Sequence, residues 1–322
     1  MKIGLVGAGY WGQKYVRIIN ETPGVELSAV HDIDERKRWN FGSKFFASYE
    51  KFTRADFDAA IVTSPAKFHF VDAVNLLEAG KHVLVEKPFA FNEFLHKTLV
   101  TSAENAGRVI FPAHIYWHND YVDYLAKAVN GMNIRYIQGL RQSLGPVRQD
   151  CGVLYDLIPH DLSILQKLGL ETPDSVQCSS TKVDDGSGKE GFVSCTLKFN
   201  KQNVLASLNA TWLYPTKLRQ MTIAGDRIVT FDDTSVTSPV KIYSRPSLAE
   251  YEWDMKTQTQ ITAPFIEHKQ EPLKSMFDEF IAACNGEQTN LQTYHRWALN
   301  ITRILEHLAD SIGFEGEVVC ME

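Results

Sequence analysis

The sequence has few cysteines, no excess of positive charge and no long apolar run. Its five cysteines are odd in number, widely spaced and without a Cys-x-x-Cys pair, so we expect reduced thiols rather than a disulfide framework. With a net charge of −6, the protein has no excess of positive charge to attract a nucleic-acid backbone, so nucleic acid is not an expected partner. No segment approaches the roughly 18 apolar residues of a membrane span, and the start does not resemble a signal peptide. These absences predict a cytoplasmic protein with no membrane partner.

The histidines and cysteines also lack the spacings typical of metal sites. No His-Glu-x-x-His pattern occurs, so no metal is predicted. Cys195 lies in a strand-like run over 192–197, where a small buried hydrophobe is a better interpretation than a nucleophile.

Length and composition predict two globular domains. The chain has 322 residues, of which 44% are hydrophobic and 22% charged, and this length exceeds one ordinary core. The pattern changes after Trp117. We therefore expect a dinucleotide-binding domain over residues 1–117 and a substrate-binding and oligomerisation domain over residues 118–322.

Short apolar runs alternate with helical stretches in the first domain. A helix is predicted over 68–79 from its apolar spacing, with Gly80 as its C-terminal stop. This alternation is typical of βαβ units and predicts an α/β Rossmann domain with a parallel sheet. Five strands are expected, at 2–6, 26–30, 59–62, 82–85 and 109–111.

The second domain has a different pattern. Helical stretches precede a series of strands, and Gly225-Asp226 marks a hairpin between two of them. We expect an α+β domain with an open-faced, mainly antiparallel sheet, and a homodimer or homotetramer formed through the open face. The expected helices are at 120–130, about 156–168, from 272 and at 297–308, and the expected strands at 191–199, 204–213, 219–224, 227–232 and 240–243.

A glycine-rich turn follows the first strand and opens a helix. Gly7 permits the tight turn, Gly9 lets the backbone approach a pyrophosphate, and Gly12 lets helix and strand pack closely. We expect the turn to bind a dinucleotide, with Tyr10 and Trp11 as part of the binding segment. The alternative is an ordinary glycine-rich turn.

Asp32 ends the second strand about twenty residues beyond the turn. A carboxylate there accepts hydrogen bonds from the adenosine ribose hydroxyls and repels a 2′-phosphate, which favours NAD over NADP. The neighbouring cations Arg36, Lys37 and Arg38 weaken this preference. The alternative role for Asp32 is a helix N-cap.

Glu86-Lys87-Pro88 ends the strand at 82–85. The carboxyl ends of strands in an open α/β sheet face the ligand crevice, so Lys87 is expected to point at the nicotinamide end of the cofactor. Its ammonium group could bind the substrate oxygen and stabilise the alkoxide as hydride departs. The alternative is a solvated lysine.

Asp156 and His160 are four residues apart at the start of a predicted helix. On one helical face they would form an acid–base pair within reach of a substrate hydroxyl. Pro159 favours a helix that starts at Asp156, which would make Asp156 an N-cap. A structural role for His160 is equally compatible with the spacing.

Taken together, these motifs resemble the glucose–fructose oxidoreductase, inositol dehydrogenase and related (Gfo/Idh/MocA) family over nearly the whole chain. The resemblance implies that Lys87 binds the reacting hydroxyl, His160 is the catalytic acid/base and Asp156 orients the substrate. It also implies a cis Lys87–Pro88 bond. The ordered motifs are the glycine turn, Thr63-Ser64-Pro65 with His69, Glu86-Lys87-Pro88, Asp156 to His160, and Glu271-Pro272-Leu273. Further cofactor contacts are expected from Thr63, Ser64, Pro65, His69, Glu86 and Lys87.

Within the family, the runs at 9–12 and 155–162 look like those of members acting on nucleotide-linked sugars. We expect a sugar substrate, with Tyr116 among its contacts, and a diphosphate held by Arg141, Arg148 or Lys217. The alternatives are a free polyol, inositol or aldose dehydrogenase and a non-catalytic dinucleotide-binding regulator. The retention of Lys87 and His160 argues against the regulator.

Overall fold

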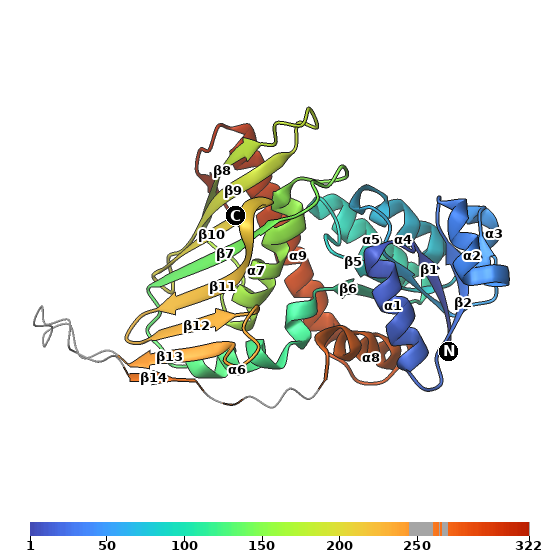
Figure 1. The fold of residues 1–322 in the computed structure, drawn as a ribbon, viewed down its shortest axis with the longest axis horizontal. Coiled ribbons are helices and arrows are strands. Elements are labelled where there is room, and N and C mark those ends of the chain that lie inside the picture. Colours follow the sequence, from blue (N-terminus) through green and yellow to red (C-terminus); the bar gives the residue numbers. More distant parts are fainter. Residues whose placement is uncertain (245–259, 264, 266–269, 322) are drawn as a thin grey trace, which may run out of the picture. The chain divides into compact units, whose positions relative to one another are not determined.

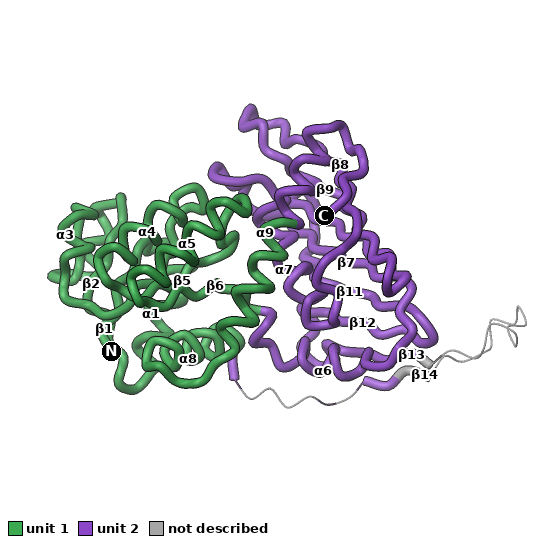
Figure 2. Tube along the Cα trace, turned by 180° about the vertical axis from the view of Figure 1, so that it is seen from behind, with its two compact units in different colours: residues 1–115, 272–303 green, residues 116–271, 304–322 purple. Residues whose placement is uncertain are grey.

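The computed structural model describes residues 1–244, 260–263, 265 and 270–321, and the chain divides into two compact units. Unit 1 combines Met1–Ile115 with Pro272–Arg303, and unit 2 combines Tyr116–Glu271 with Ile304–Glu322 (Figure 2).

Unit 1 contains a parallel sheet of six strands in the order β3-β2-β1-β4-β5-β6. The order runs outward in both directions from β1 and β4, which is the doubly wound arrangement. This confirms the predicted Rossmann fold. Only β3 was not expected, because two residues are too few to show a pattern. The strands are β1 (Lys2–Val6), β2 (Glu26–His31), β3 (Phe45–Phe46), β4 (Ala59–Val62), β5 (His82–Glu86) and β6 (Ile110–Ala113).

The register of this sheet aligns the ends of its strands. Val6 pairs with His31 on one side and with Val62 on the other, and Val62 pairs in turn with Val85. The segments that follow these strands therefore begin at one edge, where ligands bind in such sheets. The intervening helices are α1 (Tyr10–Glu21), α2 (Arg38–Phe41), α3 (Tyr49–Thr53), α4 (His69–Glu78) and α5 (Glu93–Ala106).

Two C-terminal helices depart from the expected division at residue 117. Helix α8 (Pro272–Cys284) and the first part of α9 (Leu291–Gly313) group with unit 1, although we placed 118–322 in one domain. The reason is packing: Phe111 of β6 makes T-shaped contacts with Phe280 and Tyr294, each at 5.8 Å between ring centroids. The sequence does not reveal this contact, because most strands of the second sheet lie between Phe111 and α8 in the chain.

Unit 2 is built on a sheet of nine strands in the order β14-β13-β12-β11-β7-β10-β9-β8-β15. Only β7 and β10 pair in parallel, so the predicted mainly antiparallel sheet is confirmed. The Gly225-Asp226 hairpin joins β11 to β12, as expected. The strands are β7 (Tyr136–Leu144), β8 (Ser175–Lys182), β9 (Glu190–Phe199), β10 (Val204–Thr211), β11 (Leu213–Ala224), β12 (Ile228–Asp232), β13 (Val240–Ser244), β14 (Gln260–Thr262) and β15 (Val319–Cys320). Of these, β7, β8, β14 and β15 were not predicted as strands.

Two helices of unit 2 pack on this sheet. Helix α6 (Asp120–Val129) contacts β12 and β13, and α7 (Val153–Lys167) contacts β7, β9 and β10 (Figure 1). The residues of β9 alternate between buried and half-buried along most of the strand, as expected when one face of a sheet is covered. Among the described residues, no helix is both long and apolar enough to span a bilayer.

The packing of α8 yields a test of the unit assignment. Phe280 is fully buried, so Phe280→Ala should lower the free energy of unfolding of unit 1 by about 3–5 kcal/mol. Phe314→Ala is the matched control, because that ring is 60% exposed and should cost almost nothing. Urea denaturation measures both. Equal, small effects would show that α8 does not complete the core of unit 1.

Candidate active site

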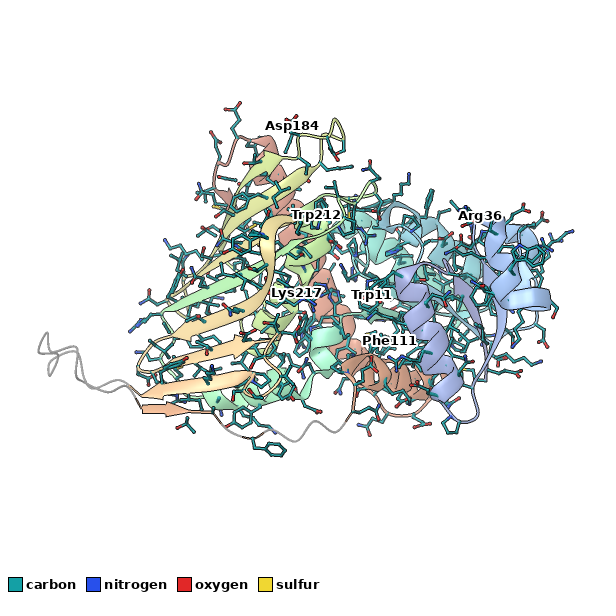
Figure 3. All side chains as sticks on the ribbon, viewed as in Figure 1. Trp11, Arg36, Phe111, Asp184, Trp212 and Lys217 are labelled. Atoms are coloured by element: carbon teal, nitrogen blue, oxygen red, sulfur yellow. The ribbon has the colours of Figure 1, made fainter. Side chains whose placement is uncertain are left out.

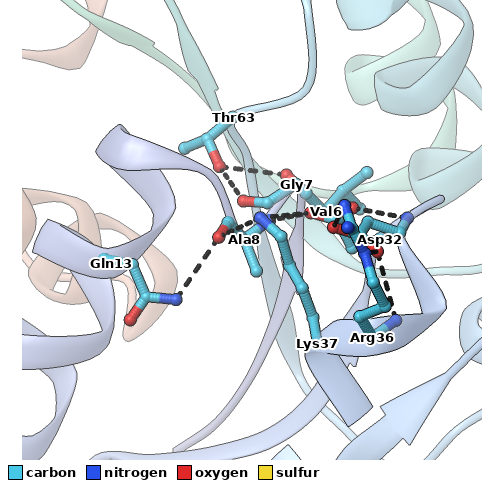
Figure 4. Close-up of polar contacts among 9 residues, drawn as sticks. Val6, Gly7, Ala8, Gln13, Asp32, Arg36, Lys37 and Thr63 are labelled. Atoms are coloured by element: carbon cyan, nitrogen blue, oxygen red, sulfur yellow. Dashed lines mark hydrogen bonds and ion pairs between the residues drawn. The ribbon is translucent and has the colours of Figure 1, made fainter. Parts of the chain in front are cut away.

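The glycine turn after β1 depends on close backbone packing (Figure 4). Gly7 has a φ of 86° and donates its amide to the His31 carbonyl at 2.8 Å. Thr63 Oγ1 donates to the carbonyls of Val6 and Gly7, at 3.0 and 2.5 Å. A Cβ on Gly12 would lie 2.2 Å from the Gly7 oxygen. The turn thus requires glycine at position 7 for its conformation and at position 12 for space.

Gly9 has a different environment, which fits a phosphate. A Cβ there would meet no atom within 4 Å, so packing within the protein does not require glycine at this position. Gly9 is the N-cap of α1 and offers no side-chain acceptor, and the first turn of α1 has no acidic residue. A helix start of this kind leaves amides and a positive dipole end for an anion. The expected dinucleotide site therefore fits the residues present.

Asp32 interacts with the glycine turn itself. Its Oδ2 accepts from the Ala8 amide at 2.7 Å, and its Oδ1 accepts from the Asp34 amide at 2.8 Å (Figure 4). The Lys37 ammonium lies 3.2 Å from Oδ2 and donates to the Ala8 carbonyl at 2.6 Å. The helix cap for the next segment is Asp34, which accepts from the Arg36 amide, so the N-cap alternative for Asp32 is wrong.

A cavity of about 220 Å³ lies beside this turn. Ile33, Pro65 and Phe68 contribute to an apolar lining, and Ser64 Oγ donates to the Asp72 carboxylate at 2.6 Å. Burial raises the pKa of Asp72. Sequence reasoning identified Ser64 and Pro65 but missed Ile33 and Phe68, and the available signal was an apolar residue in the segments that follow β2 and β4.

His69 joins two of the predicted site segments. Its ring nitrogens contact the carbonyls of Pro88, at 2.9 Å, and Ser64, at 2.8 Å, and the side chain is buried. These contacts tie the segment after β4 to the segment after β5. His69 was expected to contact the cofactor, and the geometry gives it a bracing role in this part of unit 1.

The end of β5 carries a buried carboxylate followed by a half-buried lysine. Glu86 Oε1 accepts from the Tyr15 hydroxyl at 2.8 Å, and its Oε2 accepts from the Lys87 amide at 3.1 Å. Burial, together with the Glu86 charge, raises the pKa of Tyr15 well above its usual value. The Lys87–Pro88 bond is cis, as the sequence resemblance implied. Glu86 is thus held by α1 and leads directly into Lys87.

In unit 2, Asp156 and His160 lie one turn apart on α7. The helix begins at Val153 and contains Pro159 in its interior, so the expectation of a start at Asp156 was wrong. Asp156 Oδ2 accepts from the indole of Trp212 at 3.1 Å, and its Oδ1 lies 3.7 Å from the Arg148 guanidinium. Asp156 is therefore oriented by other elements of unit 2 instead of capping its own helix.

The Tyr116 ring lies next to His160, with ring centroids 5.5 Å apart in a T-shaped arrangement. Its hydroxyl donates to Asp233 at 2.7 Å and accepts from Arg141 at 3.0 Å. Burial raises the pKa of Tyr116 to about 12. We expected Tyr116 to contact substrate, but its hydroxyl is already engaged on both sides within the core of unit 2.

The three cations considered for a diphosphate have different environments. Arg141 is 4% exposed and pairs with Asp161 at 2.7 Å, so that expectation for Arg141 is wrong. Arg148 makes a bidentate pair with Asp150 at 2.8 and 3.0 Å. Lys217, in β11, is exposed (Figure 3). Among the described parts of the chain, no group of three or more potential ligands could hold a metal ion.

The two glycines of the turn allow a matched test. Gly9→Ala should leave the thermal midpoint almost unchanged and weaken NADH binding by about tenfold or more, because the new methyl group projects into the expected phosphate position. Gly12→Ala should destabilise unit 1 by about 1–3 kcal/mol, since its methyl group collides with the Gly7 oxygen. Calorimetry measures NADH affinity and stability. Unaltered NADH affinity in Gly9→Ala would contradict this assignment of the turn.

Two family models match the chain. One is described as an oxidoreductase family with an NAD-binding Rossmann fold and matches residues 1–114, and the other is the GFO/IDH/MocA C-terminal domain and matches residues 132–228. The chain is 28% identical to UDP-N-acetylglucosamine 3-dehydrogenase of Acidithiobacillus ferrooxidans over 256 residues, 76% of this chain and 77% of the relative. It is 27% identical to the uncharacterized oxidoreductase YdgJ of Escherichia coli over 245 residues, 70% of this chain and 69% of the relative.

A solved structure supports the same fold. The WlbA dehydrogenase of Bordetella pertussis, in complex with NADH and UDP-GlcNAcA, superimposes with a TM-score of 0.81 and 18% sequence identity over 100% of this chain and 98% of that one. With both domain models matched in order, the chain belongs to the Gfo/Idh/MocA family of NAD-binding oxidoreductases.

Proposed function

We propose that this oxidoreductase transfers hydride reversibly between NAD(H) and a secondary alcohol or ketone carbon of a nucleotide-linked sugar. The proposal rests on the placement of four ionisable side chains. Lys87 directly follows the buried Glu86, and Asp156 and His160 lie one turn apart on α7. A family member that served only to bind the dinucleotide would not need an oriented carboxylate and imidazole on one helical face.

In this proposal each group has one role. Lys87 donates a hydrogen bond to the reacting oxygen and stabilises negative charge on it. His160 accepts the hydroxyl proton as the alcohol is oxidised and returns it in the reverse direction. Asp156, held by the Trp212 indole, orients the sugar. Bound NAD supplies the hydride acceptor at C4 of its nicotinamide ring.

Asp32 supports NAD over NADP in the proposal. One carboxylate oxygen, Oδ2, lies at the glycine turn, where negative charge opposes a 2′-phosphate, and the other accepts from the Asp34 amide. Lys37 offsets part of this charge, whereas Arg36 is held by Asp34 through contacts of 2.7 and 2.9 Å. The preference for NAD therefore requires that the Asp32 carboxylate outweigh Lys37, the cation that pairs with it.

Two similarities support the nucleotide sugar. The 28% identical relative is named for UDP-N-acetylglucosamine, and the WlbA structure contains UDP-GlcNAcA. One observation favours a second candidate, a free polyol or aldose. Arg141 is paired with Asp161 inside the core and Arg148 is held by Asp150, which leaves fewer cations for a diphosphate.

A substrate screen separates the two candidates. Purified protein is incubated with NAD⁺ or NADP⁺ and either UDP-sugars or free inositols and aldoses, and the absorbance of reduced nicotinamide is followed. We expect turnover with a UDP-sugar and with NAD⁺ in preference to NADP⁺. Turnover with free polyols alone would replace the first candidate by the second, and NADP⁺ preference would contradict the role of Asp32.

Lys87→Ala tests the chemistry. With the substrate that the screen identifies, kcat should fall by about 10²–10³, because one charge-stabilising donor is lost. The NADH dissociation constant should stay within about twofold. Lys97→Ala is the matched control, an exposed lysine of α5 in the same unit. An unchanged kcat in Lys87→Ala would remove this residue from the mechanism.

A further inference from the structure

Two buried cysteines face each other in the sheet of unit 2. Cys178 of β8 is paired in register with Cys195 of β9, and both side chains are fully buried. Their sulfur atoms are 3.0 Å apart, which is within contact distance. Neither residue belongs to the candidate active site, and the proposed reaction uses no thiol.

The backbone shows which type of cross-strand pair this is. The Cys178 amide donates to Ser311 Oγ of α9 at 2.9 Å, so it does not donate to β9. Directly opposed residues that do not exchange backbone hydrogen bonds have Cα atoms about 4.5 Å apart. That separation is within the range of about 4.4–6.8 Å that a disulfide spans. The backbone can therefore accommodate a bond between these sulfurs without moving the strands.

The position of β8 near the edge of the sheet determines how a small oxidant could reach the pair. Strand β15 covers β8 only opposite Ser175 and Val176, so the chain at Cys178 lies beyond the last β15 pair. There Ser311 Oγ of α9 accepts from the Cys178 amide and donates to the Cys178 carbonyl, so peroxide reaches the sulfurs when this edge opens locally. Cys195 is more enclosed, since β9 lies between β8 and β10.

We propose that Cys178 and Cys195 are a reversible disulfide site that hydrogen peroxide closes in the folded protein. The Cys178 sulfur attacks peroxide: an S–O bond forms, the O–O bond breaks, and the thiol proton leaves with the departing oxygen as water. The Cys195 sulfur then attacks the sulfenic sulfur of Cys178. The S–S bond forms, the S–O bond breaks, and the Cys195 proton leaves with hydroxide as a second water. The thiols lose two electrons and the peroxide gains them.

Burial affects the rate of this reaction. Burial and the contact with Cys178 raise the pKa of the Cys195 thiol well above its usual value. Asp161, next to His160 on α7, adds to this effect on Cys195. Cys178 lies on the strand nearer the edge of the sheet, and this position favours Cys178 as the first residue oxidised.

The experiment uses the full-length reduced protein in native buffer. After peroxide treatment, remaining thiols are alkylated in denaturant and the chain is digested without reductant. We expect a linked peptide pair containing Cys178 and Cys195, lighter by two hydrogens and absent when dithiothreitol precedes digestion. Full alkylation of both cysteines after treatment, or oxidation of Cys178 to a sulfinic acid without a link, would overturn the proposal.

Variants and stability provide controls. Cys178→Ser and Cys195→Ser should each abolish the link, and Cys320→Ser, which changes an exposed thiol, should leave it intact. The thermal midpoint of the wild-type protein should rise on oxidation, because the link constrains the unfolded chain over a separation of 17 residues. A link that forms only in denaturant, or a midpoint that falls when the link forms, would also overturn the proposal.

Discussion

The contact between helix α1 and the turn after β1 is the constraint on which the cofactor site depends. The Gly7 oxygen lies where a Gly12 side chain would be, so the helix can start only if position 12 has none. This close contact between Gly12 and Gly7 also places the start of α1 at the sheet edge where β1, β2, β4 and β5 end. Thr63 and Asp32 then hold the turn from the neighbouring strands, through the Gly7 carbonyl and the Ala8 amide. The expected phosphate site therefore depends on backbone geometry that these two side chains support.

In unit 2 buried charged side chains hold the candidate site residues in place, whereas in unit 1 the glycine turn depends on backbone packing. Arg141 donates to Asp161 and Tyr116, and Tyr116 donates to Asp233, so a chain of polar contacts lies beneath α7. Asp161 raises the pKa of Arg141, which opposes the lowering by burial and keeps the guanidinium charged. Removal of one partner from such a network would leave a buried charge without compensation. The network therefore fixes Tyr116 beside His160.

Much of the fold could be predicted from the sequence. The strands β1, β2, β4 and β5, the helices α4 and α6, and the hairpin at Gly225 all have local signals of periodicity or turn chemistry. Three kinds of feature could not be predicted. The strands β3 and β15 are too short to show a period, α8 packs on a strand far away in sequence, and α7 starts before Asp156 despite Pro159.

By itself the sequence determined the glycine-rich turn between β1 and α1, the order of the family motifs and the parallel and antiparallel character of the two sheets. These depend on residue type and spacing, which are local. Only the tertiary structure decided which polar side chains remain available. Arg141 is buried against Asp161, His69 braces two loops, and Cys178 faces Cys195 across a strand pair. Such outcomes depend on register and burial, which arise when distant segments pack together and which no single segment of the chain specifies.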